Sequence, residues 1–164
     1  MSDGKLRNMT SLYLTNEVGV LCLFRMGSRV ADKLYVGSAG GHFEKDELND
    51  ARACVLRETA EELGLSEEDL HGLRLRYITH RFKNGEIRQN YYFFATLNDP
   101  RPLESKEGIL RWVTWEELTD LPMPVSAKHM ILHYRDAGRF DDHLYAGITR
   151  QQGTDFVAME EFEG

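Results

Sequence analysis

The sequence predicts a single domain, residues 1–164, of the α/β (α+β) class. Runs of β-branched and aromatic residues alternate along the chain with segments of helical pattern. A length of 164 residues fits one compact core. Hydrophobic residues make up 41% of the chain and charged residues 29%, which is the balance of a folded soluble protein.

Composition also indicates the compartment and the partners. The apolar runs end far short of the roughly 20 residues that a membrane span needs. The first residues lack the pattern of a secretory signal, so we expect a cytoplasmic protein without a membrane partner. Cys22 and Cys54 lie in apolar segments and are expected to be buried thiols. The net charge of −7 argues against nucleic-acid binding, and it requires cations wherever an anionic ligand binds.

The first elements are two strands and a glycine-rich loop. Met9–Tyr13 and Val18–Phe24 are β-rich and are separated by Thr15–Glu17, which predicts a hairpin. Gly37–Gly41 contains three glycines in five residues. Such a segment lets the backbone turn sharply or lie close to a ligand.

A helix is predicted from Asn49 or Asp50 to Leu63, with a polar cap at its start and Gly64 just after its end. Its apolar stripe is expected to comprise Ala53, Leu56, Ala60 and Leu63. Glu58, Glu61 and Glu62 stand at i, i+3 and i+4 and therefore project together from another face.

The rest of the chain continues the alternation of strands and helices. Strands are expected at Leu73–Thr79, Asn90–Leu97 and Ile109–Thr114, with a turn at Lys83–Glu86 between the first two. Helices are expected at Trp115–Leu121 and Ala127–Asp136. A last hairpin is expected from Leu144–Thr149 and Phe156–Met159.

Three carboxylates on one helical face repel one another, because like charges at i, i+4 cost an isolated helix about 0.2 to 0.5 kcal/mol per pair. A divalent cation relieves this repulsion, since Mg²⁺ binds one or two carboxylates together with substrate phosphates. A solvated surface of the helix is the simpler account of a bare E-x-x-E-E pattern. The glycine-rich loop just before the helix favours a site for a metal ion and a phosphate.

The residues around these glutamates resemble the signature of the Nudix hydrolases. Arg57–Leu65 reads R-E-T-A-E-E-L-G-L, which is similar to the R-E-U-x-E-E-x-G-U core of that signature, and Gly41 and Glu47 match its opening G-x5-E. The box spans Gly41–Leu65, but nine residues separate Glu47 from Arg57 where the family has seven. This two-residue insertion leaves the role of Glu47 open. Thr59 also replaces an aliphatic residue, and Ala39 a frequent proline.

The resemblance implies the Nudix fold, a mixed β-sheet sandwiched between helices, and an active site with Mg²⁺ or Mn²⁺ as cofactor. In that site Glu58, Glu61 and Glu62 would hold the metal with the main-chain carbonyl of Gly40, and Arg57 would orient a glutamate. Metal-bound water would attack a diphosphate phosphorus. Glu58 is one candidate for the base, and a metal-bound hydroxide supported by a loop glutamate is the other.

A further glutamate outside the box is expected near the site by the same resemblance. Glu107 is the choice, because Glu107–Trp112 is similar to the E-G-x-x-x-W segment of MutT-type members. Glu104 is the reserve, and an exposed loop acid is the alternative account of either residue.

Substrate contacts are expected on and around the strand that begins at Asn90. Alternation places Asn90, Tyr92 and Phe94 on one face, where they could line a base pocket, although packing in the core explains most of these aromatics. Arg81, Lys83 and Arg88 flank the preceding turn and could bind phosphate, although solvation at the surface is the simpler account. His42 and His80 show no metal-ligand spacing.

The resemblance favours a MutT-type nucleoside triphosphate pyrophosphohydrolase, which releases a nucleoside monophosphate and pyrophosphate, with oxidised purine nucleotides among its candidate substrates. The alternatives are hydrolysis of ADP-ribose or another nucleotide sugar, or of a dinucleoside polyphosphate. A non-enzymatic alternative is a ligand-sensing Nudix domain. A small-molecule nucleotide is the expected partner, and whether the chain forms a homodimer stays open.

Overall fold

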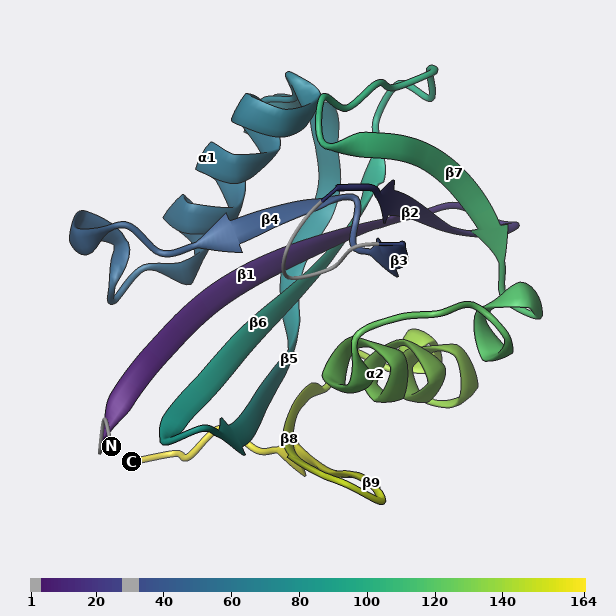
Figure 1. Cartoon of the computed structure of the whole chain (residues 1–164). Coiled ribbons are helices and arrows are strands. Elements are labelled where there is room, and N and C mark those ends of the chain that lie inside the picture. Colours follow the sequence, from purple (N-terminus) through teal and green to yellow (C-terminus); the bar gives the residue numbers. More distant parts are fainter. Residues whose placement is uncertain (1–3, 28–32) are drawn as a thin grey trace.

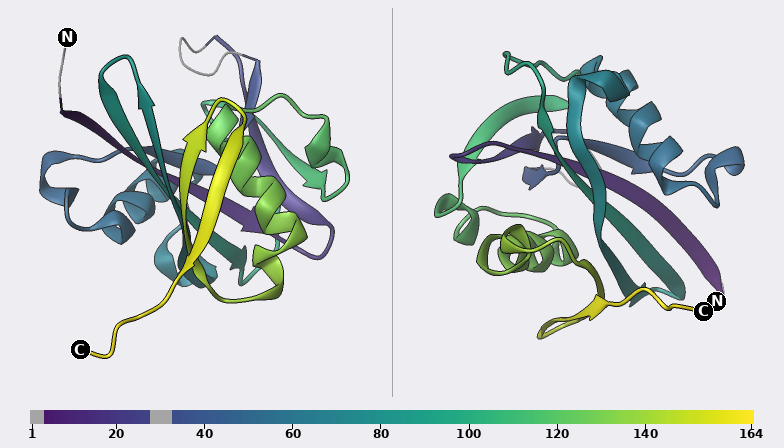
Figure 2. Two further views of the ribbon diagram at one scale, coloured as in Figure 1. Left: turned by 90° about the horizontal axis from the view of Figure 1, so that it is seen from below. Right: turned by 180° about the vertical axis from the view of Figure 1, so that it is seen from behind.

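The computed structural model of the chain describes residues 4–27 and 33–164. Figure 1 shows one twisted sheet with helix α1 on one side and helix α2 on the other, and the views of Figure 2 agree. This arrangement confirms both the α/β (α+β) class and the expected mixed sheet between helices. Among the described residues, neither helix is long and apolar enough to cross a membrane.

The sheet has the strand order β3-β2-β1-β6-β5-β8-β9, while β4 pairs with β1 and β7 with β2. The β1–β6 and β5–β8 pairs are parallel and the other pairs are antiparallel. The strands are β1 (Lys5–Thr15), β2 (Gly19–Arg25), β3 (Leu34–Val36), β4 (Ala39–His42), β5 (Leu70–Lys83), β6 (Glu86–Leu97), β7 (Gly108–Thr114), β8 (Leu144–Arg150) and β9 (Gly153–Met159). The helices are α1 (Ala51–Leu63) and α2 (Val125–Asp136), and the short 3-10 turns are η1 (Lys45–Glu47), η2 (Glu67–Asp69), η3 (Glu117–Thr119) and η4 (Gly138–Phe140).

Two cores result from the alternation of side chains along the strands. Leu12 of β1 and Phe93 of β6 pack under α1, whereas their neighbours Tyr13 and Phe94 belong to the core under α2. Successive strand residues point to opposite faces, so a single sheet supplies both cores. The buried thiols Cys22 and Cys54 confirm the expectation for the two cysteines.

Helix α1 begins and ends where its caps predict. The Asp50 side chain accepts a hydrogen bond from the Ala53 N–H at 3.0 Å, and Gly64 at the other end takes φ +67°. The expected apolar stripe is only partly confirmed: Leu63 is buried and Leu56 packs against the core, but Ala60 is exposed, and the buried face also contains Cys54, Val55 and Thr59. Thr59 can lie in the core because its hydroxyl donates to the Val55 carbonyl at 2.6 Å.

Three other elements differ from expectation. Part of the Gly37–Gly41 segment is not loop, because Ala39–His42 forms β4, whose backbone pairs with Met9–Leu12. The strand β3 was not expected. The helix predicted at Trp115–Leu121 is reduced to the 3-10 turn η3. The hairpins β1–β2, β5–β6 and β8–β9 are confirmed; β2 has the predicted length, shifted by one residue, and the other strands are longer than predicted.

Candidate active site

The carboxylates of α1 lie against the glycines of β4. A Cβ atom added to Gly41 would stand 2.5 Å from the carboxyl carbon of Glu58. The Gly40 N–H donates to Glu62 Oε2 at 3.1 Å. The two glycines therefore let two of the three box glutamates approach the edge of the sheet.

Both the backbone conformation of Gly40 and the close approach of strand β1 require a glycine at this position. It takes φ +150°, a conformation that residues with a side chain rarely adopt. A Cβ there would stand 2.2 Å from the Thr10 carbonyl oxygen of β1. Close pairing of β4 with β1 thus requires glycine, and this pairing holds the Gly40 N–H in place for Glu62.

Arg57 connects the glutamates of the box. Its Nη1 donates to Glu58 Oε1 at 3.0 Å and to Glu61 Oε2 at 3.1 Å. Its Nη2 donates to the His42 carbonyl at 3.1 Å, which ties α1 to the end of β4. The planar guanidinium thereby fixes two carboxylates and one strand relative to one another.

The same guanidinium binds Glu47, and this contact gives Glu47 a role that sequence reasoning left open. Nε and Nη2 of Arg57 donate to the two oxygens of Glu47 at 2.8 and 3.0 Å. The Glu44 N–H also donates to Glu47 Oε1, at 2.9 Å. Only 5% of the Glu47 surface is exposed. These bonds lower the pKa of Glu47 to about 2, with the hydrogen bond from Arg57 as the main cause.

The two-residue insertion therefore leaves the Glu47–Arg57 contact intact. Glu47 is the last residue of η1, and the connection to α1 runs from Leu48 to Asp50. The Asp50 N–H donates to the Glu47 carbonyl at 2.8 Å, so this connection is a tight turn.

The electrostatics of the helix face suit a bound cation. Burial raises the pKa of Glu62 to about 7, and the negative charges of Glu58 and Glu107 add to this rise. Burial also raises the pKa of Glu58, against the opposing effect of Arg57. A cation next to these groups would favour their charged forms.

The donor chemistry fits a hard divalent ion, because carboxylate oxygens lie beside the main chain of β4. In the described residues, no three histidine, cysteine, aspartate or glutamate side chains converge closely enough to enclose an ion. Mg²⁺ needs no such cage, since it keeps several water ligands and binds through one or two carboxylates. The residues therefore fit an open metal site rather than an enclosed one.

Glu107 reaches this region from the other side. It precedes β7, and Arg25 Nη2 at the end of β2 donates to Glu107 Oε2 at 2.9 Å. Gly108 pairs with Arg25, and a Cβ at Gly108 would stand 2.1 Å from the Phe24 carbonyl oxygen. The glycine after Glu107 thus allows the close strand pairing that places this acid where its charge affects Glu62. Glu104 is exposed.

Sequence reasoning did not identify Arg25. It follows an ordinary apolar strand and belongs to no motif, and only the β2–β7 register reveals that it faces Glu107. A charged residue at the end of a strand was the one available signal.

The four expected substrate contacts lie on one face of the sheet, but they are not equally accessible. Arg88 stands opposite Arg81, and Asn90 and Tyr92 follow it at intervals of two along β6. Tyr92 is 3% exposed and belongs to the core under α2. In this structure Arg81, Arg88 and Asn90 are partly exposed and can meet a ligand, whereas Tyr92 supports the sheet from within.

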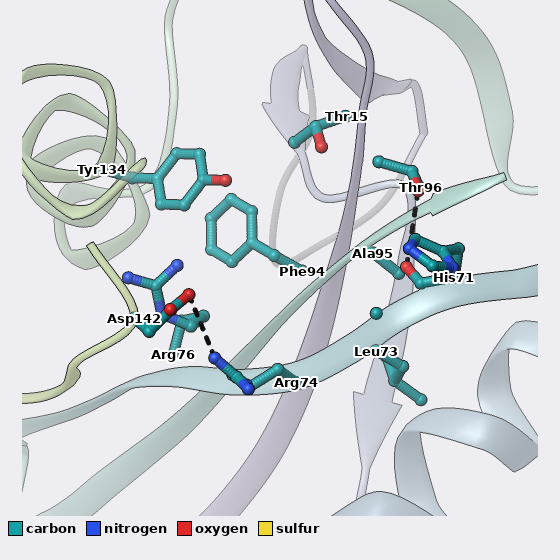
Figure 3. Close-up of a pocket in the computed structure, with 11 residues that line it drawn as sticks. Thr15, His71, Leu73, Arg74, Arg76, Phe94, Ala95, Thr96, Tyr134 and Asp142 are labelled. Carbon is teal, nitrogen blue, oxygen red and sulfur yellow. Dashed lines mark hydrogen bonds and ion pairs between the residues drawn. The ribbon is translucent and has the colours of Figure 1, made fainter. Parts of the chain in front are cut away.

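A separate pocket of about 420 Å³ lies on the α2 side of the sheet (Figure 3). Its lining comes from β1, β5, β6, α2 and Asp142, without any residue of α1 or β4. Arg76 in its wall already donates to the carbonyls of His143 and Gly138 and to Asp141, at 2.9, 2.6 and 3.0 Å. Through these three bonds from Nε and Nη2, Arg76 anchors the loop after α2.

Comparisons with known proteins agree with the geometry. A family model described as NUDIX domain matches residues 5–134. The search of curated proteins finds no match.

Among solved structures, a MutT protein from Bacillus halodurans is 23% identical, with a TM-score of 0.66 over 93% of this chain and 97% of that one. An Ap4A hydrolase from C. elegans is 15% identical, with a TM-score of 0.64 over 82% of this chain and 99% of that one. An ADP-ribose pyrophosphatase from Streptococcus suis is 15% identical, with a TM-score of 0.59 over 87% and 98%. At these identities the likenesses show the fold.

Proposed function

The chain belongs to the NUDIX domain family, whose hydrolases act on pyrophosphate bonds, and from this premise we propose that it cleaves a nucleoside triphosphate to a nucleoside monophosphate and pyrophosphate. The observation that carries the proposal is the position of Glu58 and Glu62 against the glycines of β4, with Arg57 bound to Glu58 and to Glu61. Oxidised purine nucleotides are included among the candidate substrates.

We assign the metal-binding role to Glu58, Glu61 and Glu62, with the main-chain carbonyl of Gly40 as a further oxygen ligand. Bound Mg²⁺ or Mn²⁺ would neutralise the charge on the diphosphate oxygens and lower the pKa of a bound water. Arg57 acts as a positioning residue, because its bonds to Glu58 and Glu61 limit the rotamers of both side chains.

Two acids are candidates for the residue that accepts the proton of the attacking water. Glu58 lies next to Gly41, and its pKa is raised by burial, which makes the carboxylate a better proton acceptor. Glu107 enters from the β7 side, and its hydrogen bond to Arg25 holds it at the end of β2. Separate substitution of the two residues distinguishes these roles.

Substrate binding is assigned to Arg81, Arg88 and Asn90, which share the α2 side of the sheet. Guanidinium groups form charge-assisted hydrogen bonds with phosphate oxygens, and the Asn90 amide can donate to and accept from a base or a ribose. The net charge of −7 makes such local cations necessary for an anionic substrate.

A substrate panel tests the proposal. Nucleoside triphosphates, their oxidised analogues, ADP-ribose and dinucleoside polyphosphates are incubated with the protein and either Mg²⁺ or Mn²⁺, and the products are identified by chromatography and mass spectrometry. The expected result is metal-dependent release of a monophosphate and pyrophosphate from a triphosphate. Preferential cleavage of ADP-ribose or a dinucleoside polyphosphate would replace the substrate assignment. Tight binding of a nucleotide without turnover would favour a ligand-sensing domain.

A further inference from the structure

Three arginines occupy paired positions on three neighbouring strands. In the β-sheet register Arg81 of β5 pairs with Arg88 of β6, and Arg88 pairs with Arg7 of β1. Paired residues on adjacent strands project from the same face. This arginine row (Arg7, Arg81 and Arg88) crosses the end of the sheet near the β5–β6 turn, at the lower left of Figure 1.

The positive charges of the arginine row outnumber the negative charges that pair with them. Glu86 forms ion pairs with Lys5, Arg7 and Arg88 at 3.4, 3.7 and 3.7 Å, so one carboxylate serves three cations. Among the described residues, Arg81 forms no ion pair within 4.0 Å. Like charges directly opposite each other destabilise a sheet. The row therefore carries unneutralised positive charge in a protein whose net charge is −7.

Two further observations indicate a ligand at the arginine row. The Nε atom of Arg88 is buried and has no hydrogen-bond partner, so one guanidinium donor lacks an acceptor. A buried donor without a partner costs free energy comparable to a lost hydrogen bond. On the other side, the charge of Arg81 contributes, after burial, to lowering the pKa of His129 of α2. The positive field thus extends from the sheet toward α2.

The row is connected to the candidate active site but lies apart from it. Arg7 Nη2 lies 3.3 Å from His42 Nε2, and the carbonyl of His42 binds Arg57. Gly40 pairs with Ser11, which is four residues along β1 from Arg7. Four residues of strand correspond to about 13 Å. A ligand held at both places must carry negative charge well away from the linkage that is cleaved.

We propose that the arginine row binds a phosphate group of the substrate that lies outside the cleaved diphosphate linkage. This inference rests on the proposed function, since it adds a second anchor to the same substrate. The planar forks of three guanidiniums fit phosphate oxygens. Such a phosphate can belong to a polyphosphate chain that extends past the cleaved bond, or to a phosphomonoester on the ribose.

Calorimetry with inorganic tripolyphosphate tests the anion site without turnover. The titration is done in EDTA and at low ionic strength, with the wild type, the single variant Arg81→Gln and the double variant Arg81→Gln/Arg88→Gln. The wild type is expected to bind one tripolyphosphate, and the double variant at least about tenfold more weakly, because charge-assisted hydrogen bonds are lost. Since removal of the paired arginines relieves repulsion, the thermal unfolding temperature should not fall.

The double variant Arg52→Gln/Arg101→Gln is the matched control. It removes the same charge from two exposed arginines that pair with Glu67 and Asp69 elsewhere on the molecule. Its tripolyphosphate affinity should remain that of the wild type. The proposal is overturned if Arg81→Gln/Arg88→Gln binds tripolyphosphate as the wild type does, or if the control loses as much affinity.

Kinetics then identify the source of the phosphate. Diadenosine triphosphate and diadenosine pentaphosphate differ in chain length, whereas NADH and NADPH differ by one ribose phosphate. We expect the wild type to favour the more phosphorylated member of one pair, and Arg81→Gln/Arg88→Gln to lose that preference through a higher KM. A preference that persists in the double variant contradicts the inference. If none of these four compounds is hydrolysed, the calorimetry alone decides the anion site, and the proposed function fails only if no nucleoside triphosphate is cleaved.

Discussion

Arg57 donates hydrogen bonds from Nε and Nη2 to the two carboxylate oxygens of Glu47, at 2.8 and 3.0 Å. This paired contact joins η1 to α1 across the insertion, and it leaves Nη1 of the same guanidinium for Glu58 and Glu61. The stability of the loop and the placement of the carboxylates proposed to bind the metal therefore depend on one side chain.

The Glu47–Arg57 contact predicts acid sensitivity. Arg57 holds the pKa of Glu47 at about 2, below its ordinary value of 4.5. A carboxyl whose pKa is lower in the folded state stabilises the fold above its unfolded pKa, and this contribution is lost as the pH falls toward the folded pKa. Glu47→Gln should lower the free energy of unfolding by about 2 kcal/mol at pH 7, the usual contribution of hydrogen bonds to a charged group. Between pH 4.5 and about 2 the difference from the wild type should shrink.

Urea unfolding of both proteins at a series of pH values measures this difference. Glu67→Gln is the control, because Glu67 forms an exposed ion pair with Arg52 and should contribute little at any pH. A Glu47→Gln deficit that stays constant down to pH 2.5 would contradict a lowered pKa as its source.

The metal-binding role predicts a second outcome. Glu61 is exposed and touches Arg57 alone among the box residues, so Glu61→Gln should leave the fold intact. Turnover should fall by at least about tenfold to a hundredfold, the usual cost of damage to a metal site. Steady-state rates at increasing Mg²⁺ check this, with Glu68→Gln as an exposed acid control. Near-normal turnover of Glu61→Gln at saturating Mg²⁺ rejects its role as a ligand.

Glu107 gives a third prediction. Its charge helps to raise the pKa of Glu62, so its removal should alter the metal-dependent rate rather than the fold. We expect Glu107→Ala to lose at least about tenfold in kcat, in the lower part of the range for an acid–base or metal-supporting group. Glu104→Ala is the matched loop variant. Unchanged kinetics of Glu107→Ala, with a loss in Glu104→Ala, would transfer the role to Glu104.

Local signals predicted much of the fold and of the site. The caps Asp50 and Gly64 fixed the ends of α1, because they satisfy backbone groups of the first and last turns. The spacing of the three glutamates likewise predicted that they share one face of α1, because helical periodicity is a local property. The alternation along β6 separated Phe93 from Phe94 into different cores.

Non-local pairing explains most of what the sequence did not predict. The glycines of Ala39–His42 have low strand propensity, and they extend only because β1 supplies partners for their backbone. Arg25 and Glu107 are 82 residues apart and meet through the β2–β7 register. The α1 stripe was wrong at Ala60, because the Thr59 hydroxyl donates to the helix backbone and this polar residue can therefore occupy the buried position next to exposed Ala60.

The two glycines of β4 predict different defects when each is replaced by alanine. At Gly41 the new methyl group would meet the flexible end of Glu58, which can move aside at little cost to the fold. Gly41→Ala should therefore keep a free energy of unfolding within about 1 kcal/mol of the wild type, but lose turnover because the Glu58 carboxylate is displaced. At Gly40 the methyl group would meet the Thr10 carbonyl at 2.2 Å, and the backbone has φ +150°.

Gly40→Ala should consequently destabilise the protein by more than about 2 kcal/mol, since a strained backbone conformation alone costs of order 1 to 3 kcal/mol. Urea unfolding and steady-state kinetics on both variants separate the two effects. Gly64→Ala is a third variant, which tests the effect of backbone conformation alone. Gly64 has φ +67°, has open space around it and lies outside the carboxylate contacts. It should lose stability without the loss of turnover seen in Gly41→Ala. Equal turnover of Gly41→Ala and the wild type would show that the position of Glu58 against Gly41 is not needed for catalysis.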